Sequence, residues 1–549
     1  PSVLPRDLWD KLVDNYNSSQ LFAIRYVVEQ QRSDIRQDTQ ISLIQGPPGT
    51  GKTKTIMGMV AALLHLQPAP IAGSSVQGVR CEGGPSGDAR KKNRLLLCAP
   101  SNAAVDELLS RLSQGVLSSR HGTATRKLNI VRLGNVSEMS DDSVLEYTLD
   151  NLTEGKLLRS KEWTDYIDVE RRVKALIAQI DSGRSTNYEE GVVSIGEGGK
   201  KQMKLQLIRL LQEKQKKRTD MEKRRDQIRL VLQTHRPCPL DLLFYHSFGI
   251  LNVADVVLST LSGAASADSS HPMSTAARPS VSREHLFDTV LIDEAAQATE
   301  PSTLIPLRYG CTRLVLVGDP RQLPATVLDK KAAIAGLSVS LFERLERSSH
   351  EVVMLQIQYR MHPDIRVFPS NQFYGGNLLD SDSPKKVALV SAIDPTQYLR
   401  TVEFFDIRNS SEAKDSSNSK TIINTMEAHF ILALLSHMET TIGDLSIGII
   451  TPYDGQKRLL RNILNARPRP GSFPNSSGKN RIEVNTVDGF QGREKDVIII
   501  SCVRTSRSGI GFLDDDRRMN VALTRAKKSL IVVGNAQALQ CSSSWTSFV

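Results

Sequence analysis

The stretch Gly46-Pro47-Pro48-Gly49-Thr50-Gly51-Lys52-Thr53 decides the fold of this chain. It directly follows an apolar run of strand length, Ile41–Gln45, and it precedes a helical pattern over Lys54–Leu66. A strand, a glycine-rich turn and a helix in this order form a phosphate loop, in which backbone N–H groups and the helix N-terminus hold phosphates. Lys52 then reaches the β- and γ-phosphates, and the Thr53 hydroxyl ligates Mg²⁺. The sequence therefore predicts a nucleotide site at Gly46, Pro47, Pro48, Gly49, Thr50, Gly51, Lys52 and Thr53.

Apolar runs of strand length alternate with helical patterns along most of the chain. The first set comprises Ile41–Gln45, Arg94–Ala99, Ile130–Leu133, Val256–Ser259, Thr289–Ile292 and Arg313–Val317. The second set comprises Val352–Leu355, Val402–Asp406, Ser446–Ile450, Ile482–Val484, Val497–Cys502 and Ser529–Val533. Nearly continuous apolar runs suit strands of parallel sheets that helices cover on both faces. The sequence predicts an α/β protein with two tandem parallel-sheet domains, 1–346 and 347–549.

The segment 135–250 interrupts this alternation and has a helical pattern. Apolar side chains recur there at spacings of three and four, at Tyr166, Val169, Val173, Leu176 and Ile180. This spacing predicts a helix that packs on a second helix. The partner seam, over Met203–Val231, is interrupted at Lys214, Lys217 and Arg224, which argues against pairing over its full length. We expect a helical insertion in the first domain.

The charge of the chain is concentrated in this insertion. The 549 residues include 70 Lys and Arg against 60 Asp and Glu, a net charge of +10. The stretch Lys200–Arg229 has twelve basic and four acidic residues and so accounts for +8 of that total. It is either a solvated helix face or a contact with nucleic acid. No apolar run approaches the roughly 20 residues of a membrane span, so we expect no membrane partner.

A second pattern supplies carboxylates for a bound nucleotide. Asp293 and Glu294 directly follow the apolar run Thr289–Ile292. A carboxylate at a strand end holds Mg²⁺, and its neighbour positions and polarises the attacking water, which assigns these roles to Asp293 and Glu294. Adjacent acids at such a place also cap helices, but the phosphate loop in the same chain favours the catalytic interpretation.

Three polar residues further along the chain have two interpretations each. Gln322, in Gly318-Asp319-Pro320-Arg321-Gln322, either hydrogen-bonds the γ-phosphate or belongs to a plain turn. Arg360 and Arg525 either stabilise the transition state of hydrolysis or form structural ion pairs. Composition and spacing leave these alternatives open.

Taken together, the motifs resemble superfamily 1 helicases of the up-frameshift-like group, and within it the senataxin-like helicases. The motifs in order are Gly46–Thr53, Ala99–Asn102, Asp293–Gln297, Gly318–Leu323, Gln358–His362, Val487–Glu494 and Leu523–Lys527. The senataxin-like branch is indicated by Ser259–Gly263 and Gln322–Val327. The resemblance covers nearly the whole chain and implies two RecA-like domains with ATP and Mg²⁺ between them.

The resemblance also implies roles for single residues. Gln20 reads the adenine edge, and Tyr374 stacks on adenine. Arg360 and Arg525 act as arginine fingers, while Gln322 and Glu494 sense the γ-phosphate. The family's nucleic-acid track passes the positions Ser101, Asn102, Thr260, Pro452, Tyr453 and Thr486. Contacts of this kind fall mostly on backbone and ribose and tolerate any sequence.

The resemblance implies a nuclear, monomeric motor that travels 5′-to-3′ on single-stranded RNA and DNA. Unwinding of duplexes and RNA–DNA hybrids, displacement of RNA polymerase at termination, and RNA processing are implied with it. We expect contacts with the transcription machinery to lie outside this fragment, which begins at Pro1. Relatives carry a β-barrel and a bracing segment before the residue matching Gln20, so their absence here would affect unwinding more than hydrolysis.

Two other classes of function compete with this one. A non-catalytic RNA-binding scaffold would have no need for Lys52, Asp293, Glu294, Arg360 and Arg525. A phosphate-loop enzyme of another kind, such as a GTPase, fits poorly with a Gln20 that reads adenine. Six cysteines without C-x-x-C spacing favour a reducing compartment and no metal cluster.

Overall fold

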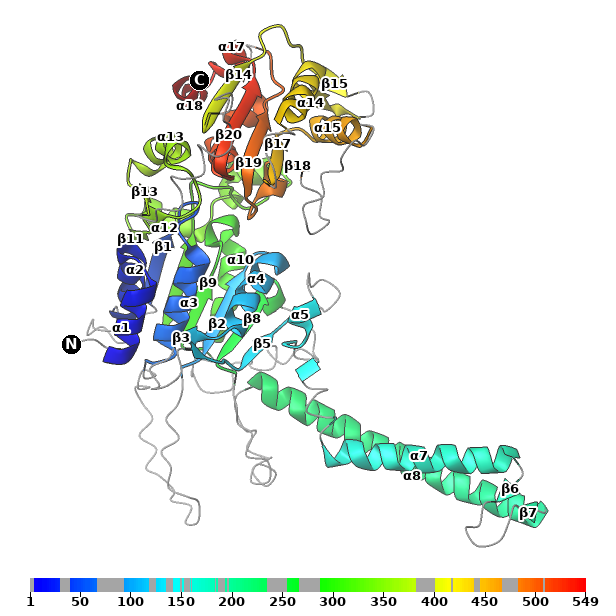
Figure 1. Cartoon of the computed structure of the whole chain (residues 1–549). Helices are drawn as coiled ribbons and strands as arrows, with labels where there is room; N and C mark the ends of the chain where they lie inside the picture. Colours follow the sequence, from blue (N-terminus) through cyan, green and yellow to red (C-terminus); the bar gives the residue numbers. More distant parts are fainter. Residues whose placement is uncertain are drawn as a thin grey trace. The chain divides into compact units, whose positions relative to one another are not determined.

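The structure is a computed structural model of the whole chain (Figure 1). The residues that it describes are 4–29, 40–66, 93–117, 125–134, 142–148, 151–152, 158, 160–182, 184–185, 193–194, 197–234, 254–265, 287–381, 400–415, 418–438, 445–466, 482–506 and 509–549. The segment 67–93, which the sequence marks as a surface loop, lies outside them except for Asn93. Among the described helices, none combines the length and apolarity that a membrane crossing needs.

The first sheet has seven strands in the order β11-β1-β10-β9-β2-β8-β5. The strands are β1 (Gln40–Gln45), β2 (Leu95–Ala99), β5 (Ile130–Arg132), β8 (Val256–Thr260), β9 (Thr289–Ile292), β10 (Arg313–Gly318) and β11 (Val352–Met354). The pairs β1–β10, β1–β11, β2–β8 and β5–β8 are parallel. All residues of β2, β9 and β10 are buried, as expected for strands covered on both faces.

Helices precede, separate and follow the strands of this sheet along the chain. They are α1 (Arg6–Asn15), α2 (Ser18–Glu29), α3 (Lys52–Leu63), α4 (Asn102–Ser113), α5 (Asp142–Leu145), α10 (Glu300–Leu304), α11 (Lys330–Ala332) and α12 (Leu341–Arg347). Side-chain caps fix where several of them begin. The Ser101 hydroxyl accepts a hydrogen bond from the Ala104 N–H at the start of α4, and the Ser340 hydroxyl does the same for Glu343 in α12.

The second sheet has five strands in the order β14-β20-β19-β17-β18, and each neighbouring pair in this order is parallel. The strands are β14 (Val402–Asp406), β17 (Ile447–Thr451), β18 (Ile482–Thr486), β19 (Lys495–Ser501) and β20 (Ala526–Gly534). Alternate residues of β19 enter two different cores, with Ile498 and Ile500 in one and Val497 and Ile499 in the other. This sheet is therefore also buried on both faces, and the predicted α/β class is confirmed.

The helices of this part are α13 (Pro363–Tyr374), α14 (Thr425–Met438), α15 (Asp454–Ala466), α16 (Asp516–Leu523), α17 (Ala536–Leu539) and α18 (Ser543–Phe548). Short strands pair as β3 (Val116–Leu117) with β4 (Thr125–Arg126), β6 (Arg184–Ser185) with β7 (Val193–Ser194), β12 (Ile357–Gln358) with β13 (Leu379–Asp380), and β15 (Ala413–Asp415) with β16 (Asn418–Ile423).

One strand does not lie where the sequence grouping places it. The order of the chain puts the run Val352–Leu355 in the second set, but β11 pairs with β1 of the first sheet, with Leu43 opposite Val352. That grouping is corrected, because strand pairing rather than sequence order decides membership of a sheet. The domain bounds 1–346 and 347–549 and the insertion 135–250 stay predictions.

The helical insertion contains α7 (Lys161–Ser182) and α8 (Glu197–Thr234), which lie side by side (Figure 1). Val169, Val173 and Leu176 pack with Leu210, and Leu207 lies against this cluster, which confirms the predicted seam. The basic residues that interrupt the seam on α8 face acids of α7, in the pairs Lys214–Glu170 at 3.3 Å, Lys217–Asp165 at 2.8 Å and Arg224–Glu162 at 3.9 Å. Pairing thus includes the three positions that interrupt the apolar seam, contrary to the expectation from sequence.

The chain divides into two compact units. The first unit comprises Pro1–Leu63, Ile292–Thr303 and Arg313–Val549, and the second comprises Leu64–Leu291 and Leu304–Thr312. The phosphate loop, the two acids, both arginines and Gln322 all belong to the first unit. Ser101, Asn102, Thr260 and the helices α7 and α8 belong to the second.

Candidate nucleotide site and nucleic-acid track

The phosphate loop connects β1 to α3. Gly49 and Gly51 have φ angles of 76° and 78°, in the left-handed region that favours glycine. Lys52 curls back over the loop, because its Nζ donates a hydrogen bond to the Gly46 carbonyl at 3.0 Å. A Cβ on Gly46 would lie 2.1 Å from the Lys52 Cγ, so this position has no room for a side chain. The loop thus has the curled backbone and the lysine that a phosphate chain requires.

The two acids follow β9. Glu294 adopts a left-handed backbone conformation with a φ of 51°, and its Oε1 lies 3.8 Å from the Lys52 Nζ. Its Oε2 accepts a hydrogen bond from the Gln297 Nε2 at 2.7 Å, which fixes the carboxylate beside the loop. Asp293 is buried and accepts a hydrogen bond from the Glu294 N–H at 2.8 Å. Thr53 and Asp293 offer a hydroxyl and a carboxylate, oxygen donors of the kind that Mg²⁺ takes together with nucleotide phosphates.

Gln322 and Arg525 meet directly. The Arg525 guanidinium donates a hydrogen bond through NH2 to the Gln322 Oε1 at 2.9 Å, and a second through Nε to the Val521 carbonyl at 2.9 Å. Burial, and next the positive charge of Arg360, lower the pKa of Arg525 to about 9. A cation withdrawn from water in this way is stabilised by an anion that approaches it.

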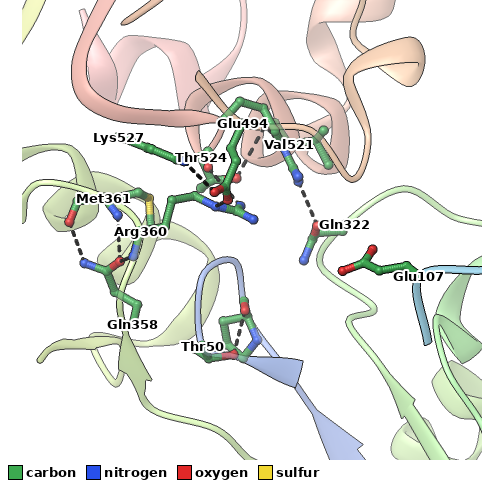
Figure 2. A network of polar contacts seen from close by, with 12 residues as sticks. Thr50, Glu107, Gln322, Gln358, Arg360, Met361, Glu494, Val521, Thr524 and Lys527 are labelled. Carbon is green, nitrogen blue, oxygen red and sulfur yellow. Dashed lines mark hydrogen bonds and ion pairs between the residues drawn. The ribbon is translucent and has the colours of Figure 1, made fainter. Parts of the chain in front are cut away.

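Arg360 is held by the backbone and by an acid (Figure 2). Its Nε donates to the Glu494 Oε2 at 2.6 Å, and its NH1 donates to the Thr524 carbonyl at 3.2 Å. Lys527 pairs with the other oxygen of Glu494 at 2.7 Å. Burial alone would raise the pKa of Glu494, but Arg360 and Lys527 hold this pKa below its ordinary value. Glu494 thus lies in contact with Arg360, one of the two arginines predicted to act on the nucleotide.

Gln20 lies against the phosphate loop. It is fully buried, its Nε2 donates to the Thr50 carbonyl at 3.0 Å, and its Oε1 accepts from the Asn17 N–H at 3.2 Å. The structure therefore brings Gln20 to the loop, as the resemblance implies, while its reading of adenine stays a prediction.

Tyr374 does not offer its ring to a nucleotide. Its side chain is only 5% exposed and packs in the core of the second sheet. Its hydroxyl donates to the Asp319 Oδ2 at 2.7 Å and accepts from the Asn520 Nδ2 at 2.7 Å. A ring enclosed in this way has no face left for a base, so the stacking role assigned to Tyr374 is corrected.

Tyr359 is an aromatic residue at the phosphate loop that sequence reasoning did not single out. Its N–H donates to the Gly49 carbonyl at 2.8 Å, which places it on the phosphate loop. Its hydroxyl accepts from the Asn17 Nδ2 at 2.8 Å, and the residue is 46% exposed. The signal that the sequence offers is its position directly before Arg360.

The predicted nucleic-acid residues of the second unit gather at one edge of the sheet. Ala99, just before Ser101 and Asn102, pairs with Thr260 between the parallel strands β2 and β8. Asn102 accepts a hydrogen bond through Oδ1 from the NH2 of Arg132 at 2.8 Å. Arg132 is buried and also donates through Nε to the Asp106 Oδ1 at 3.2 Å. Arg132 thus fixes the Asn102 amide, a role that no sequence motif indicates.

The predicted nucleic-acid residues of the first unit also lie close together. They are Pro452, Tyr453 and Thr486. Thr451, directly before Pro452, pairs with Thr486 between the parallel strands β17 and β18. Tyr453 is buried, and its hydroxyl donates to the Ile510 carbonyl at 3.3 Å. Its ring is thus fixed in the protein, and the part of Pro452, Tyr453 and Thr486 in binding nucleic acid stays a prediction.

A phosphate loop on one parallel sheet, with two arginines beside a second parallel sheet, defines the chain as a two-sheet phosphate-loop protein. A family model described as an AAA domain matches residues 15–330, and a second model with the same description matches residues 337–537. The chain belongs to this AAA-domain family, and over most of its length it is similar to senataxin-like superfamily 1 helicases.

The relatives agree with this membership. The chain is 38% identical over 533 residues to "Helicase sen1" of Schizosaccharomyces pombe, and the match covers 92% of this chain and 29% of that protein. It is 36% identical over 535 residues to "Helicase SEN1" of Saccharomyces cerevisiae, covering 92% and 22%. It is 31% identical over 547 residues to "Probable helicase senataxin" of Homo sapiens, covering 93% and 18%.

The chain therefore spans less than a third of the length of these three relatives. Among solved structures, the PRRSV helicase matches with a TM-score of 0.34 and 11% identity, over 95% of this chain and 56% of that one.

Proposed function

We propose that this chain is an ATP-driven motor that moves 5′-to-3′ along single-stranded RNA or DNA. In this proposal it unwinds duplexes and RNA–DNA hybrids, and it acts in the nucleus in transcription termination and RNA processing. The similarity to senataxin-like helicases supports the direction and the setting. The observation that carries the ATPase part is the contact between Gln322 and Arg525 in the unit that also holds Lys52 and Glu294.

The residues divide the chemistry between them. Lys52 and the loop N–H groups hold the phosphates. Thr53 and Asp293 would hold Mg²⁺, which would neutralise charge on the transferred phosphoryl group. Glu294 orients the attacking water, and Arg360 and Arg525 stabilise the charge of the transition state. Gln322 hydrogen-bonds the γ-phosphate and is released from it on hydrolysis. Glu494 moves with Arg360, because the two side chains are hydrogen-bonded.

The experiment that tests this function is ATP turnover with and without single-stranded RNA. RNA-stimulated turnover that disappears in Lys52→Ala and persists in Lys54→Ala supports the motor. Lys54 is a matched control because it is the next lysine on α3 and lies over the Tyr16 ring, 5.2 Å from its centre, rather than over the loop. Wild-type turnover in Lys52→Ala would refute the site.

The two rival classes give different results in the same assay. RNA binding without turnover indicates a scaffold, and turnover that RNA does not change indicates another phosphate-loop enzyme. A Glu294→Gln variant separates binding from chemistry, because it should retain ATP and fail to hydrolyse it. Glu300→Gln is its control, since Glu300 pairs with Arg344 at 2.7 Å and takes no part in the proposed site.

Direction is tested with hybrid duplexes that carry a single-stranded tail at one end. A motor that travels 5′-to-3′ separates substrates with a 5′ tail and leaves those with a 3′ tail intact. The opposite preference would contradict the proposed polarity without affecting the ATPase assignment.

A further inference from the structure

The Tyr374 hydroxyl connects two buried polar side chains. It donates to the Asp319 Oδ2 and accepts from the Asn520 Nδ2, both at 2.7 Å. Burial, and next the charge of Asp319, raise the pKa of Tyr374 well above its ordinary value. The phenol therefore keeps its proton over the pH range of an assay and remains a hydrogen-bond donor.

Asp319 transmits this interaction to Gln322. Its Oδ2 accepts hydrogen bonds from Tyr374 and from the Gln322 Nε2 at 2.7 Å, and its Oδ1 accepts from the Gln45 Nε2 at 3.2 Å and the Arg321 N–H at 3.1 Å. The Asp319 Oδ2 acts as an acceptor here, so it faces the NH₂ side of the Gln322 amide. The amide oxygen then faces Arg525, which donates to it at 2.9 Å.

Tyr374 stands where three functional segments meet. It is the last residue of α13, a helix that begins three residues after Arg360. Asp319 belongs to the loop that carries Gln322, and Asn520 lies on α16, just before Arg525. Asn520 also donates to the Arg321 carbonyl at 2.7 Å, so α16 is held to that loop directly and, through Tyr374, to Asp319.

We propose that Tyr374 is a positioning residue that sets the orientation of Gln322 and couples it to the arginines at 360 and 525. This proposal rests on the proposed ATPase function. Without the phenol, Asp319 loses one of its donors and holds the Gln322 amide less firmly. ATP still binds, because none of the phosphate-loop hydrogen bonds involves Tyr374. The loss therefore appears in the rate of the chemical step, which kcat measures.

The test is steady-state ATP turnover of Tyr374→Phe at saturating single-stranded RNA. We expect kcat to fall about tenfold, the scale of one hydrogen bond to a charged group, with KM for ATP changed by less than about twofold. Tyr309→Phe is the matched control, because Tyr309 is similarly buried and its hydroxyl donates to the Ala264 carbonyl at 2.5 Å. This control should keep the wild-type kcat.

A double-mutant cycle tests the route through Gln322. In a Gln322→Ala background, Tyr374→Phe should change kcat no further. Additive losses of kcat in the double mutant, or a wild-type kcat in Tyr374→Phe, would overturn the positioning role. In either case, ATP turnover by the wild-type protein would still support the proposed ATPase function. Absence of turnover in the wild type would remove the proposed function, and this inference with it.

Discussion

We predict that the adenine base of ATP stacks on the exposed ring of Tyr359. Replacing it by alanine should weaken ATP binding by about tenfold, because stacking of a base on an aromatic ring contributes roughly 1–3 kcal/mol. Binding of inorganic tripolyphosphate should not change, because that ligand has no base. Dissociation constants for both ligands, measured by calorimetry, check this difference.

Phe22→Ala serves as the control for this variant. Phe22 is an aromatic residue of α2 that is 57% exposed, and its ring stacks on Tyr26 rather than on the phosphate loop. Equal weakening of ATP and tripolyphosphate in Tyr359→Ala would show that Tyr359 supports the loop backbone instead of the base.

The buried carboxyl of Glu427 should make the free energy of unfolding depend on pH. This carboxyl is fully buried on α14 and accepts hydrogen bonds from the Val503 N–H, at 2.9 and 3.0 Å, and from the Ser501 hydroxyl at 2.7 Å. Burial raises the pKa of Glu427 from 4.5 to about 8. Between these values the folded chain holds a proton that the unfolded chain releases, so the contribution of this group to the free energy of unfolding falls as pH rises from 4.5 to 8.

The neutral variant Glu427→Gln should flatten this part of the pH dependence. Urea unfolding at a series of pH values from about 5 to about 9 measures it in both proteins, with Glu300→Gln as a partly exposed control. Parallel curves for the wild type and Glu427→Gln would mean that Glu427 is ionised in the folded chain.

The two tyrosines show why part of the site was predictable and part was not. Gly49, Gly51 and Lys52 act within one short loop, so their spacing in the sequence already specifies the geometry. Whether an aromatic ring is free or enclosed depends on residues far away in the sequence. Tyr374 is enclosed by hydrogen bonds with Asp319 and Asn520, and no local pattern records them.

At the scale of elements, α8 presents two rows of basic residues with different surroundings. Lys214 and Lys217 pair with acids of α7, whereas Lys216 and Lys223 are exposed and have no ion pair among the described residues. If α8 binds nucleic acid, the exposed row meets the phosphates. Replacing Lys216 and Lys223 by alanine should weaken RNA binding and reduce the slope of log K against log salt by about 1.4, or about 0.7 for each phosphate that is no longer neutralised.

The variant with Lys214 and Lys217 replaced removes the same charge and is the matched control. It should leave the salt slope unchanged and cost little stability, since surface ion pairs contribute about 0–1 kcal/mol each. Equal slopes in all three proteins would assign both rows to solvated surface. Sequence counting places the excess charge on this helix, but only the acids of α7 reveal which lysines are already neutralised.

At the scale of the whole molecule, the residues proposed to hold ATP come from segments far apart in the sequence. A non-hydrolysable ATP analogue with Mg²⁺ should therefore stabilise the folded chain, by about 2.7 kcal/mol at a hundredfold excess over its Kd. Thermal melting measures this as a rise in Tm. The rise should be absent in Lys52→Ala and kept in Asn102→Ala, which alters only the predicted nucleic-acid track. Its absence in both variants would indicate damage to the fold.

Most strands of both sheets were predictable, because strands buried on both faces are apolar throughout. The run Val497–Cys502 is an example, since β19 places alternate residues in two cores. The composition of a strand does not indicate which strand it pairs with. β11 has the same apolar character as its neighbours in sequence, and only its pairing with β1 assigns it to the first sheet.

The discontinuity of the first unit also has a consequence for biosynthesis. β1 emerges early from the ribosome, but both of its neighbours, β10 and β11, lie about 270 to 310 residues later. At a synthesis rate of about 5–20 residues per second, this strand waits roughly 15 seconds to a minute for its partners. During that interval the apolar edge of β1 is open to other chains. The phosphate loop attached to it can contact Gln20 early, but it meets Glu294 and Tyr359 only after much more of the protein has been made.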